Sequence, residues 1–372
     1  MKFSIEKKDL NTNIQQLIGI VPSRNTMPIL TNYLIEANEE TGKVKFTSTD
    51  LEITVVAEFP ANISESGRST VLAKNFNEIV NSFPDDMINV MLEEEKLIIN
   101  CQKSHFHLNC ADTTQFPMIP LMNFDNALKI DAQMFKKMIN STSFAVSSDI
   151  NRPIFTGINW KISPNKQMMA ATDIKKIAEF KTYSQLDIPD EIELIIPRKG
   201  LLFLERVINE NNNELLVIPE TNRIIFNYNN FTIFSHLIKG KFPDYTQAIP
   251  QNNTNILTIN KSLLKNVVRR VSLLASEETL KIRFDINDSG LALNAMKREE
   301  GDADEKIEDI QYEGEHLIIA FNYKFLIEII NAIDSENIVI NMGTSNEPAL
   351  FVSPEKHDEY NYRYILMPLR LA

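Results

Sequence analysis

The segment LKIDAQMFKKMI, residues 128–139, has two further copies in this chain of 372 residues. Its first residues alternate between apolar and polar side chains, as in a strand, and its later residues have helical apolar spacing. The segments FSIEKKDLNTNI at residues 3–14 and LTINKSLLKNVV at residues 257–268 repeat this pattern. The copies lie about 125 residues apart, which is the size of a domain, so the sequence predicts three homologous domains.

Two shorter markers also repeat. Thr49-Asp50 and Thr172-Asp173 each end an apolar strand, and Phe116-Pro117 and Phe242-Pro243 each close a copy. Each copy reads as helix, strands, helix, strands, which predicts an α+β fold. Tandem copies of one domain usually build a curved or closed surface rather than one catalytic cleft. The predicted helices occupy residues 10–20, 74–83, 134–143, 198–208, 261–272 and 323–332.

Polar and charged residues mark the expected helix ends, loops and linkers of the three copies. Asp131 and Asn260 stand where a helix N-cap is expected. We expect the charged segments Lys297–Lys306 and Asn209–Glu214 to be solvated loops. Linkers follow Pro120 and Pro250, so the predicted domains comprise residues 1–122, 123–252 and 253–372.

Charge is distributed unevenly along the chain. The formal net charge is −12, which by itself argues against a nucleic-acid partner. The six predicted helices, however, carry a net charge of +8, and the remainder carries −20. Lys and Arg are good helix formers, which could explain this, but Glu is equally good and is scarce in these helices. If the helices share a surface, that surface attracts a phosphate backbone.

The sequence also indicates a compartment. The N-terminal residues are charged and lack the apolar region of a signal peptide, and no run of 18 apolar residues is present. Cys101 and Cys110 could face each other across a hairpin, but two cysteines in a chain of this length favour a reducing environment. We therefore expect a cytoplasmic protein without membrane segments or a structural disulfide.

Signatures of catalysis are missing from the sequence. It contains no GxxxxGK[ST], GxGxxG, GxSxG or HExxH motif, and its five histidines are scattered. Asp302, Asp304 and Glu305 could hold a cation, but they lack the glycine and distal glutamate of an EF-hand loop. Asp50 and Asp173 could act as a carboxylate pair, but hydrogen bonding of the turns that follow them is the favoured interpretation. We expect no catalytic residue, no metal and no cofactor.

The whole chain resembles the bacterial DNA polymerase III beta subunit, the replicative sliding clamp of the DNA clamp family. The resemblance covers the beginning, the middle and the end of the sequence. It is carried by Met1-Lys2-Phe3, residues 24–30 (RNTMPIL), residues 47–52 (TSTDLE), residues 171–173 (ATD), residues 241–245 (KFPDY) and residues 367–371 (MPLRL).

This resemblance implies three tandem clamp domains, each with two helices packed on antiparallel sheets. It implies a head-to-tail homodimer that closes into a ring, with helices inside and sheets outside. Such a ring encircles duplex DNA without regard to sequence, tethers the replicative polymerase and other replication and repair factors, and has no activity of its own. A clamp loader opens the ring with ATP, for which this chain has no site. Residues expected to contact DNA are Arg24, Lys74, Lys136, Lys137, Arg198, Lys199, Lys265 and Arg269.

The resemblance further implies a hydrophobic pocket between the second and third domains. It receives short clamp-binding motifs of the polymerase alpha subunit, the clamp-loader delta subunit and other proteins. The chain departs from the family here, with Ile174-Lys175-Lys176 and Thr246-Gln247, so a shifted peptide preference is expected. The matching residues are Arg152, Phe155, Thr172, Ile174, Lys176, Ile177, Pro243, Leu366, Met367, Pro368, Leu369 and Arg370.

Two further expectations concern assembly and alternatives. By resemblance, Phe106 and Leu108 of one subunit meet Leu273 and Leu274 of the other at the dimer interface. The alternatives to a clamp are a metal-dependent nuclease or hydrolase that uses Asp50 and Asp173, and a peptide-binding scaffold without DNA. The basic helices argue against the scaffold. The apolar C-terminal segment, residues 365–371, is expected to be held against a surface rather than frayed.

Overall fold

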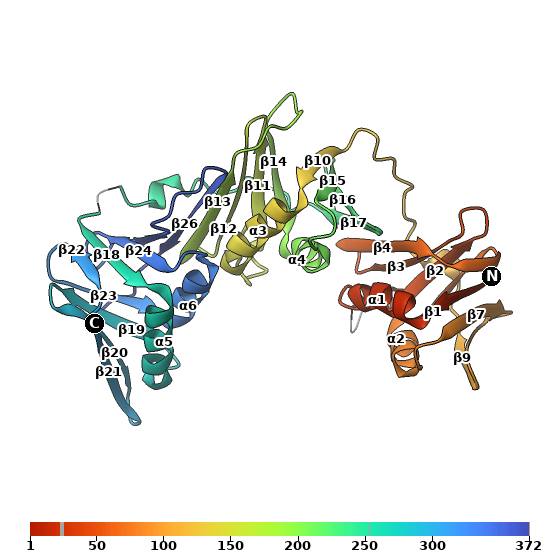
Figure 1. Ribbon diagram of the computed structural model, residues 1–372, viewed down its shortest axis with the longest axis horizontal. Helices are drawn as coiled ribbons and strands as arrows, with labels where there is room; N and C mark the ends of the chain where they lie inside the picture. Colours follow the sequence, from red (N-terminus) through yellow and green to blue (C-terminus); the bar gives the residue numbers. More distant parts are fainter. Residues whose placement is uncertain (23–25, 252, 372) are drawn as a thin grey trace. The chain divides into compact units, whose positions relative to one another are not determined.

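The computed structural model describes residues 1–22, 26–251 and 253–371, and the chain divides into two compact units. Residues 1–133 and 199–237 form the first unit, and residues 134–198 and 238–372 form the second. Each unit contains two antiparallel sheets with helices packed on them (Figure 1). The expected α+β class is therefore confirmed. The three domain boundaries stay predictions, because the two units are defined by compactness and divide the chain differently.

The first unit is built around a five-stranded and an eight-stranded sheet. Its elements are β1 (Lys2–Glu6), α1 (Lys7–Leu17), η1 (Pro28–Thr31), β2 (Asn32–Asn38), β3 (Lys43–Thr49), β4 (Ile53–Pro60), β5 (Asn62–Glu65), β6 (Gly67–Leu72), α2 (Ala73–Ser82), β7 (Met87–Glu93), β8 (Lys96–Cys101), β9 (Ser104–Asn109), η2 (Thr113–Gln115), β10 (Leu128–Asp131), α4 (Arg198–Val207), β15 (Glu214–Pro219), β16 (Arg223–Tyr228) and β17 (Phe231–His236).

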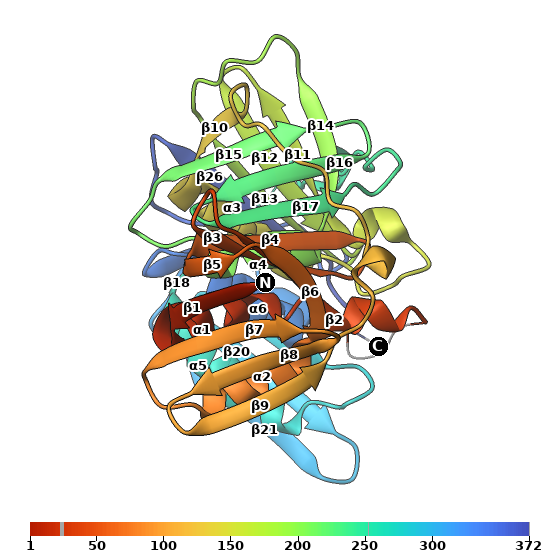
Figure 2. The same cartoon turned by 90° about the vertical axis from the view of Figure 1, so that its right-hand side faces the viewer.

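The strand order explains how this unit holds together. The five-stranded sheet has the order β5-β1-β7-β8-β9, with β9 at a free edge (Figure 2), and the larger sheet has the order β10-β15-β16-β17-β4-β3-β2-β6. Helix α1 contacts β1 of the smaller sheet and β3 and β4 of the larger one. Its apolar residues Leu10, Ile14 and Leu17 are buried, so the helix contributes to one core with both sheets.

The second unit is built around a nine-stranded and a four-stranded sheet. Its elements are α3 (Ala132–Thr142), η3 (Ser143–Ala145), η4 (Pro153–Phe155), β11 (Gly157–Ser163), β12 (Lys166–Thr172), β13 (Lys176–Thr182), β14 (Ile192–Pro197), η5 (Thr246–Ala248), β18 (Asn255–Asn260), α5 (Lys261–Val271), η6 (Ser272–Leu274), β19 (Lys281–Asn287), β20 (Gly290–Lys297), β21 (Gly301–Ile307), β22 (Gln311–Glu313), β23 (Leu317–Asn322), α6 (Tyr323–Ala332), β24 (Asn337–Met342), β25 (Ala349–Val352) and β26 (Tyr360–Leu366).

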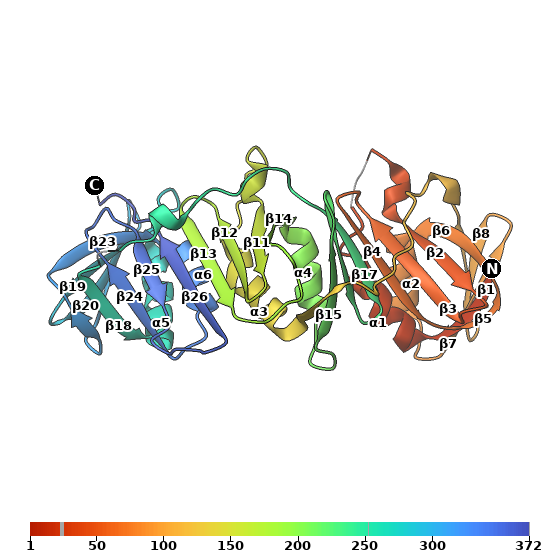
Figure 3. The same cartoon turned by 90° about the horizontal axis from the view of Figure 1, so that it is seen from above.

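Strand β26, near the C-terminus, pairs with β13 from the middle of the sequence and with β25, so that both belong to one sheet. The nine-stranded sheet has the order β14-β11-β12-β13-β26-β25-β24-β18-β22 (Figure 3), and β13 pairs with β26 from Lys176↔Leu366 to Thr182↔Tyr360. The smaller sheet has the order β21-β20-β19-β23. Helices α5 and α6 contact each other, α5 also contacts β18 and β20, and α6 contacts β23 and β26. The C-terminal strand therefore lies in the interior of the larger sheet.

The predicted helices are confirmed. All six are present within three residues of their predicted bounds, and the first begins earlier than expected, at Lys7. The N-cap at Asn260 is also confirmed, because its side chain accepts hydrogen bonds from the backbone N–H groups of Ser262 and Leu263 at 3.0 and 3.1 Å. The N-cap at Asp131 stays a prediction. No helix in the described part of the chain is long and apolar enough to span a membrane.

One predicted loop is wrong and one is right. Residues Lys297–Lys306 are not a loop, because most of them belong to β21, which pairs with β20 from Lys297↔Gly301 to Leu291↔Ile307. Strand β21 lies at the edge of its sheet, where charged side chains are typical. Because its residues are mostly charged, the sequence favours a loop here instead of a strand. In the second segment, residues 209–213 form a turn before β15, as expected, and Glu214 is the first residue of that strand.

The two cysteines are free, as favoured by the sequence. Cys101 pairs with Ser104 at the turn between β8 and β9, whereas the N–H of Cys110 bonds the carbonyl of Glu95 at the opposite end of these strands. The register therefore separates the thiols along the hairpin and excludes the disulfide considered as an alternative.

Candidate functional site

The turn after β12 positions the first group of predicted peptide-site residues. The N–H of Ile174 donates to the Thr172 hydroxyl at 2.9 Å, and the Asp173 carboxylate accepts from the N–H groups of Lys175 and Lys176 at 2.9 Å each. Ile174 adopts a φ of 80°, a left-handed conformation that a β-branched residue rarely occupies. The turn therefore holds the Ile174 side chain outward, and it is 50% exposed.

The segment after β26 lies beside this turn. The N–H of Met367 donates to the carbonyl of Lys175 at 2.9 Å, and the N–H of Leu369 donates to the carbonyl of Ala320 at 2.7 Å. The Lys281 ammonium also donates to the carbonyls of Arg370 and Leu371, at 3.2 Å each. The expectation that the apolar C-terminal segment is held against a surface is confirmed. We use the name Ile174 site for the residues Thr172, Ile174, Ile177, Pro243, Leu366 and Met367.

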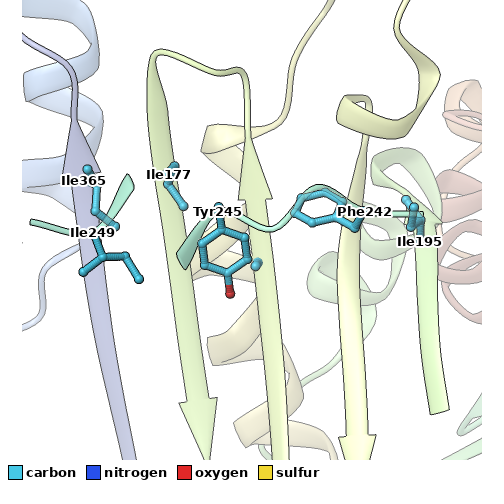
Figure 4. Close-up of a cluster of buried hydrophobic side chains, with 7 residues drawn as sticks. Ile177, Ile195, Phe242, Tyr245, Ile249 and Ile365 are labelled. Atoms are coloured by element: carbon cyan, nitrogen blue, oxygen red, sulfur yellow. The ribbon is translucent and has the colours of Figure 1, made fainter. Parts of the chain in front are cut away.

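A buried apolar cluster supports the Ile174 site. Phe242, Tyr245 and Ile249 lie across strands that contribute Ile177 and Ile365 (Figure 4). Of the predicted peptide residues, Ile177 and Leu366 are buried, whereas Met367 is 40% exposed. Pro243 is half-buried beside Phe242. The buried members therefore form a rigid base, and Ile174 and Met367 offer apolar surface.

A buried charge network fixes Tyr245 in this cluster. Its hydroxyl donates to a Glu179 carboxylate oxygen at 2.6 Å, and the same carboxylate binds Arg363 at 2.6 Å and Lys181 at 2.8 Å. Burial raises the pKa of Glu179, but these hydrogen bonds outweigh burial and leave it lowered. Burial and the Glu179 charge raise the pKa of Tyr245. Tyr245 therefore stays neutral and Glu179 stays ionised at neutral pH, which keeps the hydrogen bond in place. A single sequence carries no signal that pairs Glu179 with Tyr245.

Lys176 lies on the opposite face of β13 from Ile177. Its side chain is 4% exposed, and its ammonium pairs with the carboxylate of Glu328 on α6. The ammonium also lies 4.2 Å from the centre of the Phe325 ring. The resemblance groups Lys176 with the peptide residues; its ammonium packs against α6 and also lies 3.7 Å from the carboxylate of Asp173 in the turn.

The remaining predicted peptide residues are half-buried or exposed. Arg152 forms an ion pair with Asp149 at 2.8 Å, and its guanidinium carbon lies 5.9 Å from the Phe155 ring centre. Pro368 and Leu369 are half-buried, and Arg370 is exposed.

The basic residues expected at DNA differ in availability. Lys74 is 77% exposed, with its ammonium 3.9 Å from the Glu78 carboxylate, and Arg198 and Arg269 are also exposed. Lys137 pairs with Asp334 at 2.7 Å and lies 3.7 Å from the centre of the Tyr360 ring. Lys199 pairs with Asp50 and also donates to the carbonyl of Ile20 at 3.3 Å. Lys136 and Lys265 are half-buried, and Arg24 lies outside the described residues.

Of the residues expected at a dimer interface, Phe106 and Leu273 are exposed, whereas Leu108 and Leu274 are half-buried. Phe106 and Leu108 belong to the edge strand β9, where Phe106 is 38% exposed and packs 5.4 Å from the Phe83 ring. Leu273 and Leu274 belong to η6, and Leu273 is 78% exposed. Large apolar side chains with this exposure are candidates for an interface.

The carboxylates considered for catalysis have structural partners. Asp50 accepts from the N–H groups of Glu52 and Ile53 at 3.0 and 2.9 Å, as Asp173 does in its own turn. This confirms that each carboxylate stabilises the turn that follows it. In the cation alternative, Glu305 pairs with Arg270 and Asp304 accepts from Asn294. Among the residues placed by the structure, no group of three His, Cys, Asp or Glu has metal-site geometry.

Three family models match consecutive parts of the chain. They are the N-terminal domain of the DNA polymerase III beta subunit at residues 1–120, its central domain at residues 129–244 and its C-terminal domain at residues 246–370. The beta sliding clamp of Bacillus subtilis is 30% identical over 384 residues, with all of both chains covered. That of Staphylococcus aureus is 28% identical over 380 residues, covering 100% of this chain and 99% of the relative.

Solved structures agree with these sequence matches. The DnaN sliding clamp of Pseudomonas aeruginosa, solved with griselimycin bound, has a TM-score of 0.92 at 28% identity. The sliding clamp of Bacillus subtilis has the same TM-score and identity. Both comparisons cover 100% of each chain.

Proposed function

Because the chain belongs to the DNA polymerase III beta subunit family, the bacterial sliding clamps, we propose that the residues described above make its contacts with DNA, with partner peptides and with a second copy. The chain is a sliding clamp of DNA replication. It is a non-catalytic processivity subunit, and the nuclease alternative has no support. Its partners are DNA, the polymerase and the clamp loader.

The exposed basic residues serve DNA binding. Lys74, Arg198 and Arg269 offer cations to phosphate oxygens, and such contacts carry no sequence information. Each contact is weak in salt and easily exchanged with the next phosphate, so many of them retain DNA without stopping its movement. The acidic remainder of the chain repels DNA from other surfaces.

Partner peptides bind at the Ile174 site. The observation that carries this proposal is the pair of exposed apolar side chains, Ile174 and Met367, held over a buried cluster by backbone hydrogen bonds. A rigid base reduces the entropy lost on binding, and a flexible methionine adapts to several peptide side chains. Lys175 and Arg370 are exposed nearby in sequence and favour peptides that carry a carboxylate.

A second copy closes the ring through β9 and the η6 region. Both β9 and β21 are edge strands with unpaired backbone groups, and Leu273 of η6 is 78% exposed. Each apolar side chain buried there contributes roughly 1.5–3 kcal/mol. The resulting dimer works on chromosomal DNA in the nucleoid.

Retention on circular DNA tests this function. The protein is loaded onto nicked circular duplex with a bacterial clamp loader and ATP, and the DNA-bound fraction is isolated by gel filtration. We expect retention on the circle and loss after the circle is cut, because a ring slides off free ends. The variant L273A/L274A should be monomeric by light scattering and should not be retained. Equal retention on linear and circular DNA would overturn the encircling mechanism.

A further inference from the structure

We propose that a groove beside Leu51 in the first unit is a second peptide-binding site, selective for a large apolar side chain flanked by Lys or Arg. We call it the Leu51 groove; it is lined by Leu51, Glu52, the segment Pro117–Pro120, Arg223, Phe234 and His236, and encloses about 150 Å³. A cavity of about this volume accommodates benzene in another protein, so the groove has room for one Leu or Phe side chain. The proposal rests on the function proposed for the Ile174 site.

The first argument is that the two turns have the same geometry. The N–H of Leu51 donates to the Thr49 hydroxyl at 3.1 Å, where Ile174 donates to Thr172 at 2.9 Å. The φ of Leu51 is 77°, close to the 80° of Ile174, and the side chains are 46% and 50% exposed. Both turns therefore hold a bulky residue in the left-handed conformation, which is strained. Strained backbone of this kind is concentrated at functional positions.

The strand pairing shows which residues correspond. The carbonyl of Glu52 accepts the N–H of His236 at 2.9 Å, and the carbonyl of Lys175 accepts the N–H of Met367 at 2.9 Å. β17 therefore ends beside β4 in the same way that β26 ends beside β13. His236 takes the place of Met367, and Glu52 takes the place of Lys175.

The second argument is charge. Arg223 in the groove is already compensated, because its guanidinium binds Glu220 at 2.6 and 3.3 Å. Glu52 is exposed, and its carboxylate has no ion pair within the described part of the chain. The Leu51 groove therefore offers an uncompensated negative charge where the Ile174 site offers Lys175. A partner segment with Lys or Arg beside its apolar side chain complements this charge.

The third argument is the exposed apolar wall. Met118 is 97% exposed, beside a Leu51 that is itself 46% exposed, and both line the groove. The corresponding segment after Phe242 instead presents the exposed polar residues Asp244, Thr246 and Gln247. Adjacent apolar side chains left in water are costly unless a partner covers them, and Met is suited to such contacts.

Methionine-methyl NMR tests the proposal at both sites in one sample. Met118 reports on the Leu51 groove and Met367 on the Ile174 site, and the signals are assigned with M118L and M367L. The probes are a basic hexapeptide, Gly-Lys-Leu-Phe-Lys-Gly, and its acidic counterpart, Gly-Glu-Leu-Phe-Glu-Gly, both with blocked ends. We expect the basic probe to shift the Met118 signal. Glu52→Lys should weaken that binding about fivefold and strengthen binding of the acidic probe, because exposed charges contribute modestly.

Matched controls separate the possible outcomes. Lys175→Glu should change binding only at the Met367 signal, and Leu51→Ser should abolish the Met118 shift while leaving Met367 unaffected. The proposal is overturned if neither probe moves Met118 at millimolar concentration, or if Glu52→Lys leaves the charge preference unchanged. A polymerase-derived peptide that shifts Met367 in the same sample keeps the proposed function intact. If that peptide shifts neither signal, the proposed function fails as well.

Discussion

Lys176 is a charged side chain held almost entirely out of water on the α6 side of β13. The equivalent position in the first repeat is Ile53, which is 2% exposed, so this position accepts an apolar residue. We expect Lys176→Met to change the free energy of unfolding by less than about 1 kcal/mol, because the Glu328 left behind is 41% exposed and can be hydrated. The other partner, Asp173, lies 3.7 Å from the ammonium and keeps its two backbone hydrogen bonds. Urea unfolding measures this change.

The same variant tests the role of Lys176 in peptide binding. Because the Lys176 side chain lies on the opposite face of β13 from Ile177, Lys176→Met should leave the affinity for a polymerase-derived peptide unchanged. Ile174→Ser is the matched control and should weaken binding. If Lys176→Met weakened it equally, the sequence-based grouping of Lys176 with the peptide residues would be right. Periodicity could not assign its face, because β13 is buried on both sides and shows no polar alternation.

Asp334 is a carboxylate whose lowered pKa should make the stability of the fold depend on pH. Burial raises its pKa, but hydrogen bonds from Lys137, Tyr362 and Tyr360 outweigh burial and lower it from 3.8 to about 2. A lowered folded-state pKa stabilises the fold above pH 3.8, and this contribution is lost as pH falls through about 2. Since the side chain is 34% exposed, we expect a contribution of about 1 kcal/mol after screening.

A comparison with Asp334→Asn measures this contribution. The wild-type protein should be more stable than the variant in urea at pH 5 to 7, and the difference should shrink between about pH 4 and pH 2. Asp173→Asn is unsuitable as the control because it also breaks a turn. Asp190→Asn, which replaces an exposed carboxylate, is a better one. An Asp334→Asn difference that stayed constant down to pH 2 would contradict the assigned network.

At the scale of secondary-structure elements, the sequence predicts helices better than it predicts strands at the edge of a sheet. Helix α5 was predictable because Leu264, Val267, Val268 and Val271 repeat at helical spacing and are all buried. Strand β21 was missed because its residues are charged and only its pairing with β20 makes it a strand. The repeat of Thr49-Asp50 and Thr172-Asp173 predicted equivalent turns. It could not reveal that one turn carries Glu52 and the other Lys175 beside exposed apolar side chains.

The C-terminal segment is the element whose removal most directly tests the Ile174 site. Deleting residues 367–372 removes Met367 and the backbone bond from Leu369 to Ala320. We expect binding of polymerase-derived peptides to be lost, measured by fluorescence anisotropy, whereas the dimer should persist in light scattering. Deleting only residues 371–372 is the control and should retain binding. Unchanged affinity in the longer deletion would move the peptide site elsewhere.

At the scale of the whole molecule, charge is separated by secondary structure. The chain carries 50 acidic and 38 basic residues, yet the six predicted helices carry a net charge of +8. The structure adds that some of these cations are already paired. Lys137 with Asp334 and Lys199 with Asp50 stabilise the fold, whereas Arg198 and Arg269 are exposed. Lys74 is intermediate, because it is 77% exposed but its ammonium lies 3.9 Å from the Glu78 carboxylate. Residue type alone could not separate these groups, since partners are set by tertiary contacts.

This distinction predicts the salt dependence of DNA binding. We expect Arg269→Glu and Arg198→Glu each to lower the slope of log affinity against log salt by about 0.9, the loss of one phosphate contact. Lys137→Gln should leave the slope unchanged, because Asp334 already neutralises Lys137. Anisotropy titrations of a short duplex at several salt concentrations measure the slopes, and two unrelated duplex sequences should give the same values. A slope lowered by Lys137→Gln as much as by Arg269→Glu would show that the Asp334 pair opens at DNA, and a sequence preference would contradict contact through phosphates alone.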